Sequence, residues 1–222
     1  MNTLTSPRVS ALLARLFAEA DAADGALRAE IGRLSPDERA ALMGRARTDY
    51  RGFYGDARAM FLPVSPETGR MLYMLARATK ARSIVEYGTS FGLSTIHLAA
   101  AVRDNGGGLV IGSEFEPSKV ARARAHLAEA GLGELVEIRE GDALETLARG
   151  LPDAIDLVLL DGAKILYPQI LALLQPRLAA GALVVADNAD DSPEYLARVR
   201  DAAKGYVSVP FARDVELSAW LA

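Results

Sequence analysis

The spacing of apolar residues predicts a helical first part of the chain. Apolar side chains recur there at the i, i+3, i+4, i+7, i+8 spacing of one buried helix face, at Val9, Leu12, Leu13, Leu16 and Phe17. We expect Gly25 to interrupt this helix. Ser35 and Ser65, each followed by proline, are typical N-caps of two further helices, and Glu38 can complete a capping box with Ser35. The aromatic and glycine-rich segment 50–55 is expected to connect them.

From residue 82 the pattern changes to short apolar runs that alternate with helical segments. The runs predict strands at 83–86, 109–111, 135–138, 155–160, 182–186, 206–210 and 215–220. Helices are expected between them at 94–102, 117–130, 168–178 and 193–203. This alternation predicts an α/β fold with a parallel sheet covered by helices on both faces. Such sheets bind ligands at the carboxyl ends of their strands.

The length and charge narrow the function classes. The 222 residues suit one α/β domain with a modest extension. The net charge of −4 provides no basic field for nucleic acid or an anionic membrane, so we expect neither as a partner. The absence of cysteine excludes disulfides, thiolate nucleophiles and thiolate metal sites.

The N-terminus does not have the pattern of a signal peptide, because Arg8, Arg15 and Glu19 interrupt its apolar stretch. No window approaches the roughly 18 consecutive apolar residues of a membrane helix. We therefore expect a cytoplasmic protein.

A glycine loop follows the first predicted strand at 86–92. Gly88 and Gly92 carry no side chain, so a ligand can approach the backbone closely, and the helix that follows offers free N–H groups to an anion. The spacing is E-x-G-x-x-x-G, beginning at Glu86, rather than the G-x-G-x-x-G of a pyrophosphate site. Taken alone, the loop also fits a tight structural turn or a nicotinamide dinucleotide site.

Two acids at neighbouring strand ends favour a nucleoside ligand. Glu114 ends the second strand, where a carboxylate can accept both ribose hydroxyls of an adenosine. Its alternative is a solvated charge beside Glu116. Asp142 follows the third strand and can accept the adenine amino group or cap a helix, and the two roles are compatible.

Hard oxygen ligands follow the fourth and fifth strands. Asp161 ends the fourth strand, and Asp187 and Asn188 end the fifth. These strands are neighbours in a doubly wound sheet, so the two carboxylates and the amide are expected to converge as a Mg²⁺, Ca²⁺ or Mn²⁺ site. The alternative is that these residues are turn formers. Lys164 lies beside the site, where a cation would lower its pKa and allow it to act as a general base.

These motifs together resemble the cation-dependent, catechol-type O-methyltransferases that use S-adenosylmethionine (SAM). The resemblance rests on residues 85–95, 161–164 and 185–188, and it extends from about Phe61 to the C-terminus. It implies a Rossmann-like, mostly parallel sheet of seven strands with an N-terminal helical extension. The expected division is an extension at 1–60 and a methyltransferase domain at 61–222.

The resemblance also implies roles for individual residues. Lys164 would be the base, and Asp161, Asp187 and Asn188 would hold the divalent cation. Asp161 would also contact the cofactor, together with Val64, Glu86, Gly88, Ser90, Gly92, Ser94, Glu114, Asp142 and Ala143. Many bacterial members carry a second aspartate where this chain has Ala163. The first 60 residues match the family loosely, and in relatives this region covers the substrate pocket or builds a dimer.

The predicted function is thus methyl transfer from SAM to a hydroxyl of a small, catechol-like substrate, assisted by a divalent cation. The alternatives are a metal-independent SAM methyltransferase acting on nitrogen or a single hydroxyl, a nicotinamide-dependent oxidoreductase, and a non-catalytic SAM-binding or dimerisation module. A homodimer is expected, because the early helices carry apolar faces beyond what one sheet needs; the alternative is that these faces pack wholly within the chain. Tyr50, Phe53, Tyr54 and Trp220 can wall an aromatic pocket, whereas His97 and His126 are expected to be helix residues without a catalytic role.

Overall fold

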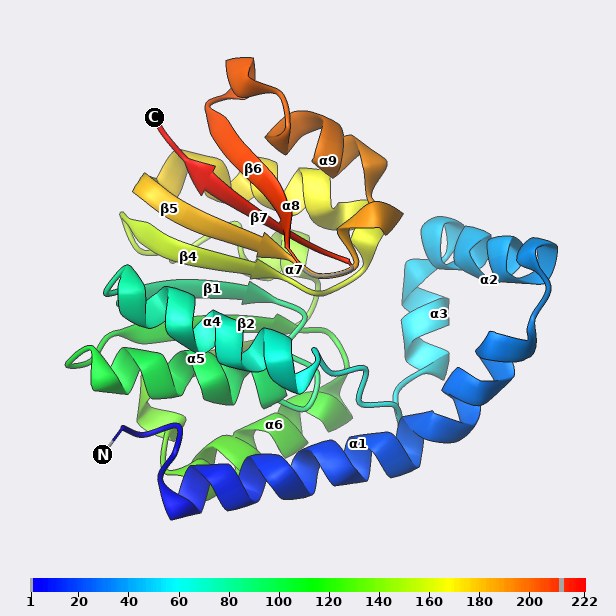
Figure 1. The fold of residues 1–222 in the computed structure, drawn as a ribbon, viewed down its shortest axis with the longest axis horizontal. Coiled ribbons are helices and arrows are strands. Elements are labelled where there is room, and N and C mark those ends of the chain that lie inside the picture. Colours follow the sequence, from blue (N-terminus) through cyan, green and yellow to red (C-terminus); the bar gives the residue numbers. More distant parts are fainter. Residues whose placement is uncertain (1, 212–213) are drawn as a thin grey trace.

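A seven-stranded sheet forms the centre of the protein in a computed structural model that describes residues 2–211 and 214–222 (Figure 1). Its strands are β1 (Ser83–Tyr87), β2 (Leu109–Glu114), β3 (Val136–Glu140), β4 (Ile155–Leu160), β5 (Leu178–Ala186), β6 (Tyr206–Phe211) and β7 (Val215–Trp220). They lie in the order β3-β2-β1-β4-β5-β7-β6, and β7 runs antiparallel to β5 and β6, whereas the other neighbouring strands are parallel. The predicted Rossmann-like α/β fold is confirmed.

Helices cover both faces of this sheet. One face carries α1 (Pro7–Arg33), α4 (Pro66–Ala78), α5 (Leu93–Asp104) and α6 (Pro117–Ala130). The other carries α7 (Ala143–Thr146), α8 (Tyr167–Leu174) and α9 (Pro193–Val199). Short 3₁₀ turns lie at Gly133–Leu135, Lys164–Leu166, Gln175–Arg177, Ala189–Asp191 and Ala202–Lys204.

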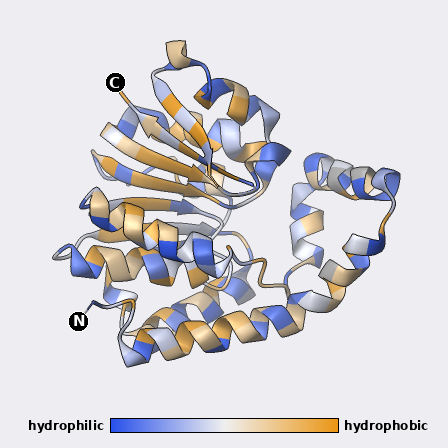
Figure 2. Cartoon of the chain, in the orientation of Figure 1, coloured by the Kyte–Doolittle hydropathy of each residue, from blue (hydrophilic) through white to orange (hydrophobic). Residues whose placement is uncertain are grey.

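The alternation of side chains along each strand divides the interior into two hydrophobic cores. Ile84 of β1 and Leu157 of β4 point into the first core, beneath α1, α4, α5 and α6; the second core lies on the opposite face of the sheet. Their sequence neighbours Val85 and Val158 point into the core beneath α7, α8 and α9. Because both faces are buried, the central strands are apolar at nearly every position, as Figure 2 shows.

The first helix is continuous, so the predicted interruption at Gly25 is wrong. A glycine inside a helix costs only about 1 kcal/mol relative to alanine. Burial of Val9, Leu12 and Leu16 in the first core outweighs that cost. The neighbouring Asp24 is also buried, and its carboxylate accepts hydrogen bonds from the backbone N–H groups of residues 61 and 62 at 2.9 and 2.8 Å. This contact ties α1 to the segment that leads into the domain.

An arm made of α2 (Pro36–Thr48) and α3 (Tyr50–Asp56) projects beyond the carboxyl ends of the strands (Figure 1). The capping box predicted for α2 is confirmed, since Ser35 N donates to Glu38 Oε2 at 2.8 Å and Glu38 N donates to Ser35 Oγ at 3.3 Å. The connector predicted at 50–55 is wrong, because these residues form α3. The Asp49 carboxylate caps α3 by accepting from Gly52 N at 3.0 Å, and tertiary contacts complete the helix.

The end of α8 and the start of β5 differ from the prediction because of Pro176, which lies between them. The helix expected over 168–178 ends at Leu174, and Gln175–Arg177 forms a 3₁₀ turn around Pro176. Proline lacks the N–H that the helix would need there. Strand β5 consequently begins at Leu178 rather than at residue 182. Among the residues that the structure describes, no helix is long and apolar enough to cross a membrane.

The buried His97 gives the fold a specific sensitivity to acid. Its ring lies against Gly69 of α4, its Nδ1 is 2.8 Å from the Leu93 carbonyl oxygen, and it is 2% exposed. Burial lowers its pKa from 6.5 to about 4. The unfolded chain therefore binds a proton at this site before the folded chain does. Neutral His97 therefore stabilises the folded chain fully above the pKa of the unfolded chain, 6.5. This stabilisation is lost as the pH falls from 6.5 through about 4.

We therefore expect His97 to remove about 3 kcal/mol of unfolding free energy between pH 7 and pH 4. Urea unfolding at both pH values, in the wild type and in His97→Gln, measures this difference directly. The variant should lose about 3 kcal/mol less than the wild type, because glutamine does not titrate. The matching histidine on α6, His126, provides the comparison through His126→Gln. Equal pH slopes in the wild type and His97→Gln would contradict the prediction.

Candidate functional site

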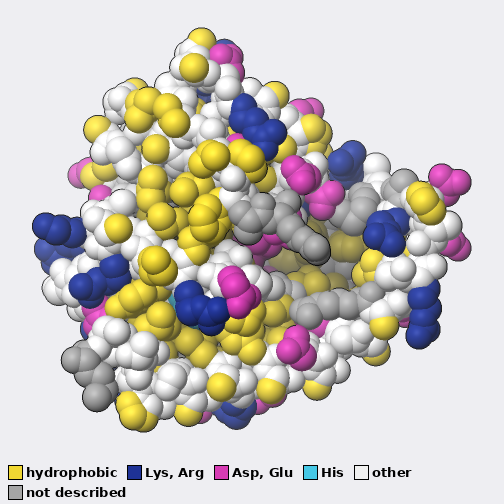
Figure 3. Space-filling view, viewed as in Figure 1, with side chains coloured by type: hydrophobic (Ala, Val, Ile, Leu, Met, Phe, Trp, Pro, Cys, Tyr) yellow, Lys and Arg dark blue, Asp and Glu magenta, His cyan; other side chains and the backbone are white. Residues whose placement is uncertain are grey.

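A cavity of about 530 Å³ opens at the carboxyl edge of the sheet. Its walls are the loop after β1, the ends of β2 and β4, the start of α7 and the helix α3. Figure 3 shows the surface hollowed between the arm and the sheet domain. The volume lies in the range of small-molecule and cofactor sites.

The glycine loop is packed directly against the loop after β4. Gly88 has a φ of +95°, and a Cβ at this position would lie 2.4 Å from the carbonyl oxygen of Asp161. The N–H groups of Gly88 and Thr89 both donate to the Ser113 carbonyl oxygen, at 3.1 and 3.2 Å. Glycine is therefore required at residue 88 both by its φ and by the close approach of the two loops.

Glu86 is buried behind the glycine loop rather than facing the cavity. Its carboxylate accepts hydrogen bonds from the hydroxyls of Ser94, Thr95 and Thr89 at 2.7, 2.6 and 3.0 Å. Burial raises the pKa of Glu86, and the three hydroxyls oppose that rise. Glu86 thus ties the loop to the first turn of α5. Val64, Gly92 and Ser94 are likewise buried and lie outside the cavity lining.

Glu114 and Ser90 form one end of the cavity. Glu114 Oε2 accepts from Ser90 N at 2.8 Å, and Oε1 accepts from Glu116 N at 3.0 Å. Glu114 and Ser90, both predicted to contact the cofactor, line the cavity. Lys119, which the sequence reasoning missed, lies 5% exposed on α6, and its Nζ donates to Ser90 Oγ at 3.3 Å.

Asp142 caps α7 and also faces the cavity, so one position is compatible with both of its predicted roles. Its Oδ1 accepts from Leu144 N at 2.9 Å. Its Oδ2 forms an ion pair with Arg51 of α3. The adjacent Ala143 also lines the cavity. Arg51 was not singled out from the sequence.

Asp161 and Lys164 lie together at the opposite end of the cavity. Lys164 Nζ donates to Asp161 Oδ1 at 3.1 Å, and both side chains are largely buried. Burial lowers the pKa of Lys164, but Asp161, Tyr54 and Asp187 together outweigh this effect, so the pKa lies above the ordinary lysine value. The side chains of the protein alone therefore shift this pKa in the direction opposite to the one expected from a nearby cation.

Backbone pairing brings Asp187 beside Asp161. Asp161 N donates to the Tyr87 carbonyl at 2.8 Å, and Asp187 N donates to the Leu160 carbonyl at 2.9 Å, which continues the sheet register beyond the strand ends. The two carboxyl groups lie close enough to perturb each other's pKa. Burial raises the pKa of both groups, and repulsion from Asp161 raises that of Asp187 further.

Asn188 completes the predicted ligand set. It has a φ of +49° and lines the cavity, and its Nδ2 donates to Asp214 Oδ2 at 3.1 Å. Asp214 was missed from the sequence. Within residues 2–211 and 214–222, no three Asp, Glu, His or Cys side chains converge as a metal site would require. The candidate cation ligands therefore remain two carboxylates and one amide.

Two tyrosines hold the loop after β4 in place. The Tyr87 hydroxyl accepts from Ala163 N at 3.0 Å, and its ring lies where a side chain at Gly162 would be. The Tyr167 hydroxyl donates to the carbonyl oxygens of Leu160 and Asp187, both at 2.8 Å. Asp161 and Lys164 consequently sit on a rigid support.

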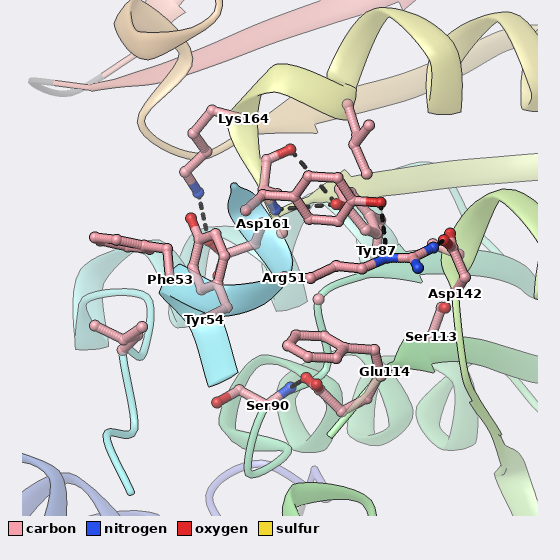
Figure 4. Close-up of a pocket in the computed structure, with 18 of the residues that line it drawn as sticks. Arg51, Phe53, Tyr54, Tyr87, Ser90, Ser113, Glu114, Asp142, Asp161 and Lys164 are labelled. Atoms are coloured by element: carbon pink, nitrogen blue, oxygen red, sulfur yellow. Dashed lines mark hydrogen bonds and ion pairs between the residues drawn. The ribbon is translucent and has the colours of Figure 1, made fainter. Parts of the chain in front are cut away.

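Helix α3 supplies an aromatic wall. Tyr50, Phe53 and Tyr54 line the cavity, and Figure 4 shows the Tyr54 hydroxyl near the Lys164 ammonium. Burial raises the pKa of Tyr54, and the Lys164 charge opposes that rise. Trp220 does not line the cavity and instead packs on Tyr206, with ring centroids 4.8 Å apart.

Similarity to known proteins covers the sheet side of this cavity, from the end of β1 to the end of β5. A family described as a methyltransferase domain matches residues 85–189. A catechol O-methyltransferase of Niastella koreensis is 34% identical over 130 residues, which is 57% of this chain and 58% of that protein. A catechol O-methyltransferase of Mycobacterium tuberculosis is 36% identical over 144 residues, or 64% of this chain and 63% of that protein. The chain thus matches about three fifths of the length of these two relatives.

A longer share is matched in a putative O-methyltransferase of Mycolicibacterium smegmatis, which is 32% identical over 151 residues, or 64% of this chain and 71% of that protein. Among solved structures, an O-methyltransferase of Streptomyces achromogenes in complex with SAM is 27% identical, with a TM-score of 0.64 over 81% of this chain and 89% of that one. An O-methyltransferase of Bacillus cereus in complex with S-adenosylhomocysteine (SAH) has the same fold, with 23% identity and a TM-score of 0.67 over 72% of this chain and 83% of that one.

Proposed function

The chain belongs to the class I, catechol-type O-methyltransferase family, and on that premise we propose that it transfers a methyl group from SAM to a hydroxyl of a small, catechol-like substrate with the help of a divalent cation. The observation that carries the proposal is the contact between the two loops of the cavity. The glycine loop, the expected cofactor cradle, touches the loop that carries Asp161 and Lys164. Cofactor and base are therefore expected to meet in one space.

The side chains at one end of the cavity suit SAM. Glu114 offers a buried carboxylate for ribose hydroxyls, and Asp142 offers one for the adenine amino group. SAM, when bound, supplies a methyl group made electrophilic by the sulfonium charge. Gly88 leaves the loop backbone open to close approach, which supports placement of the methionine part beside Asp161.

The other end of the cavity suits an aromatic acceptor with a hydroxyl group. Tyr50, Phe53 and Tyr54 form an aromatic wall, in which the Phe53 and Tyr54 rings meet edge to face, and Lys164 lies beside Tyr54. We propose that a divalent cation held by Asp161 and Asp187 would offset the negative charge that raises the Lys164 pKa, so that neutral Lys164 takes the proton from the attacking hydroxyl. Holding the hydroxyl oxygen and the methyl group in line contributes several kcal/mol to lowering the barrier.

The ligand set at the strand ends fits a hard divalent cation. Asp161 and Asp187 bring two partly buried carboxylates against a single lysine, so the group carries excess negative charge when both are ionised. Asn188 adds an amide oxygen. A divalent cation held by these residues would supply positive charge that favours the ionised form of the acceptor hydroxyl.

Chelation of divalent cations is expected to lower kcat/KM by on the order of 100-fold or more, because the cation accounts for several kcal/mol of charge stabilisation. The measurement is methyl transfer from SAM to a panel of catechols, followed by mass spectrometry, with EDTA and then with added Mg²⁺, Ca²⁺ or Mn²⁺. Isothermal titration of Mg²⁺ into the wild type and into Asp161→Asn or Asp187→Asn measures binding independently.

Asp190→Asn is the matched control, since Asp190 is an exposed carboxylate three residues after Asp187. It should retain Mg²⁺ affinity, whereas Asp161→Asn and Asp187→Asn should lose it. Full activity in EDTA would reject the cation and favour the alternative of a metal-independent SAM methyltransferase. A chain that binds SAH but methylates no member of the panel would reject the catechol class.

The homodimer stays a prediction. An exposed apolar row on the edge strand β6 supports it, since Val207, Val209 and Phe211 are 60%, 52% and 46% exposed. These residues point to the face of β6 opposite Tyr206, whose side chain is buried in the second core. Unpaired edge strands of this kind favour association between chains.

A further inference from the structure

An ion pair between Arg51 and Asp142 crosses the cavity. Arg51 comes from α3, in the arm, and Asp142 comes from the sheet side, 91 positions later in the chain. Figure 4 shows the Arg51 side chain reaching toward Asp142 through the space between Tyr87 and Glu114. The pair therefore joins the arm to the domain across the cofactor end of the cavity.

The ion pair uses the carboxylate oxygen that an adenine would need. Asp142 Oδ1 is engaged by Leu144 N at 2.9 Å, which caps α7. Its Oδ2 is engaged by the Arg51 guanidinium. An adenosine that reaches from Glu114 to Asp142 would also pass through the space that the Arg51 side chain takes.

We propose that Arg51 is a gate residue that competes with the cofactor for Asp142. This inference rests on the proposed SAM-dependent function. The Arg51 guanidinium occupies both the Asp142 Oδ2 contact and the space that the adenine would take, so the cofactor enters only when the Arg51 side chain swings away. Each binding event therefore includes the loss of one ion pair, and that loss weakens the apparent affinity for the cofactor.

Arg51 lies on α3, the same helix that carries the aromatic wall at the acceptor end of the cavity. Tyr54 lies on the same helix three positions later, beside Lys164. The Arg51 Nε also donates to the Tyr50 hydroxyl at 3.3 Å, so the guanidinium keeps a partner on its own helix when it leaves Asp142. Release of Asp142 consequently loosens the link between the domain and the helix that carries the aromatic wall.

Arg51→Ala is expected to bind SAH about two- to fivefold more tightly than the wild type, because cofactor binding no longer has to break an exposed ion pair. Isothermal titration with SAH measures this without turnover. Raising the salt concentration should tighten SAH binding to the wild type and leave Arg51→Ala unchanged, since salt screens the ion pair.

Arg45→Ala is the matched control. Arg45 also lies in the arm and forms an exposed ion pair with Asp56, but it does not line the cavity. It should leave SAH affinity unchanged. In an Asp142→Asn background, Arg51→Ala should have no further effect, because the competing carboxylate is absent.

Unchanged or weaker SAH binding by Arg51→Ala would overturn the gate, and so would equal tightening by Arg45→Ala. A wild type that binds no SAH would overturn both the gate and the proposed function. SAH binding without methyl transfer would reject the proposed function alone, because the gate is measured by binding.

Discussion

Replacing Lys164 with methionine is expected to lower kcat by about 10²- to 10⁴-fold, the range that a positioned general base contributes. Methionine keeps the length of the side chain but cannot accept a proton. SAH affinity should stay within about threefold of the wild type, because Lys164 lies at the acceptor end of the cavity and the cofactor side chains remain. Steady-state kinetics with the best catechol, and titration with SAH, measure the two effects separately.

Lys164→Arg separates proton transfer from charge. Arginine would preserve the attraction to Asp161 but stays protonated, so it cannot serve as the base. We expect it to be nearly as slow as Lys164→Met. Lys204→Met, on an exposed 3₁₀ turn, is the control and should have wild-type kcat. Substantial activity in Lys164→Arg would assign Lys164 a purely electrostatic role.

The features predicted correctly from the sequence depend on local rules. The strands β1 and β4 are short, apolar and bounded by loop residues, so their positions follow from hydrophobic spacing alone. Parallel strands in such a sheet end at one edge, which is enough to place Asp161 and Asp187 together. The structure places these two side chains close enough to perturb each other's pKa.

The arm departs from these rules because tertiary contacts decide its structure. Two glycines and three aromatic residues give segment 50–55 a weak helix propensity, yet it forms most of α3. Tyr50 and Tyr54 pack against the second core, and Asp49 caps the helix. Packing of this kind comes from residues that are distant in the sequence, so no local pattern could reveal it.

Two residues of the site were missed for the same reason, because their partners are distant in the sequence. Arg51 meets Asp142 across 91 positions, and Asn188 meets Asp214 across 26. Neither Arg51 nor Asp214 belongs to a local motif. The burial of Glu86 is different, because the sequence carries a signal for it. Hydroxyl residues at positions 89, 94 and 95 follow Glu86 closely enough to satisfy a buried carboxylate.

Gly88→Ala is expected to lower SAH affinity by on the order of 10- to 100-fold, because forcing a side chain into a tight contact costs about 1–3 kcal/mol. The new Cβ would lie 2.4 Å from the Asp161 carbonyl oxygen and 2.7 Å from Gly162 N, which are backbone atoms. Since Tyr87 holds the loop after β4, the glycine loop must move away from Asp161.

Gly107→Ala isolates the clash from the backbone strain. Gly107 has a φ of +102°, close to the +95° of Gly88, but a Cβ there meets no atom within 4 Å. Alanine at either position costs about 1–2 kcal/mol for the left-handed backbone, which urea unfolding measures. Only Gly88→Ala should also lose SAH binding and methyl transfer. If both variants lost stability equally and kept SAH affinity, the contact between the two loops would have no part in holding the cofactor, and the observation that carries the proposed function would fail.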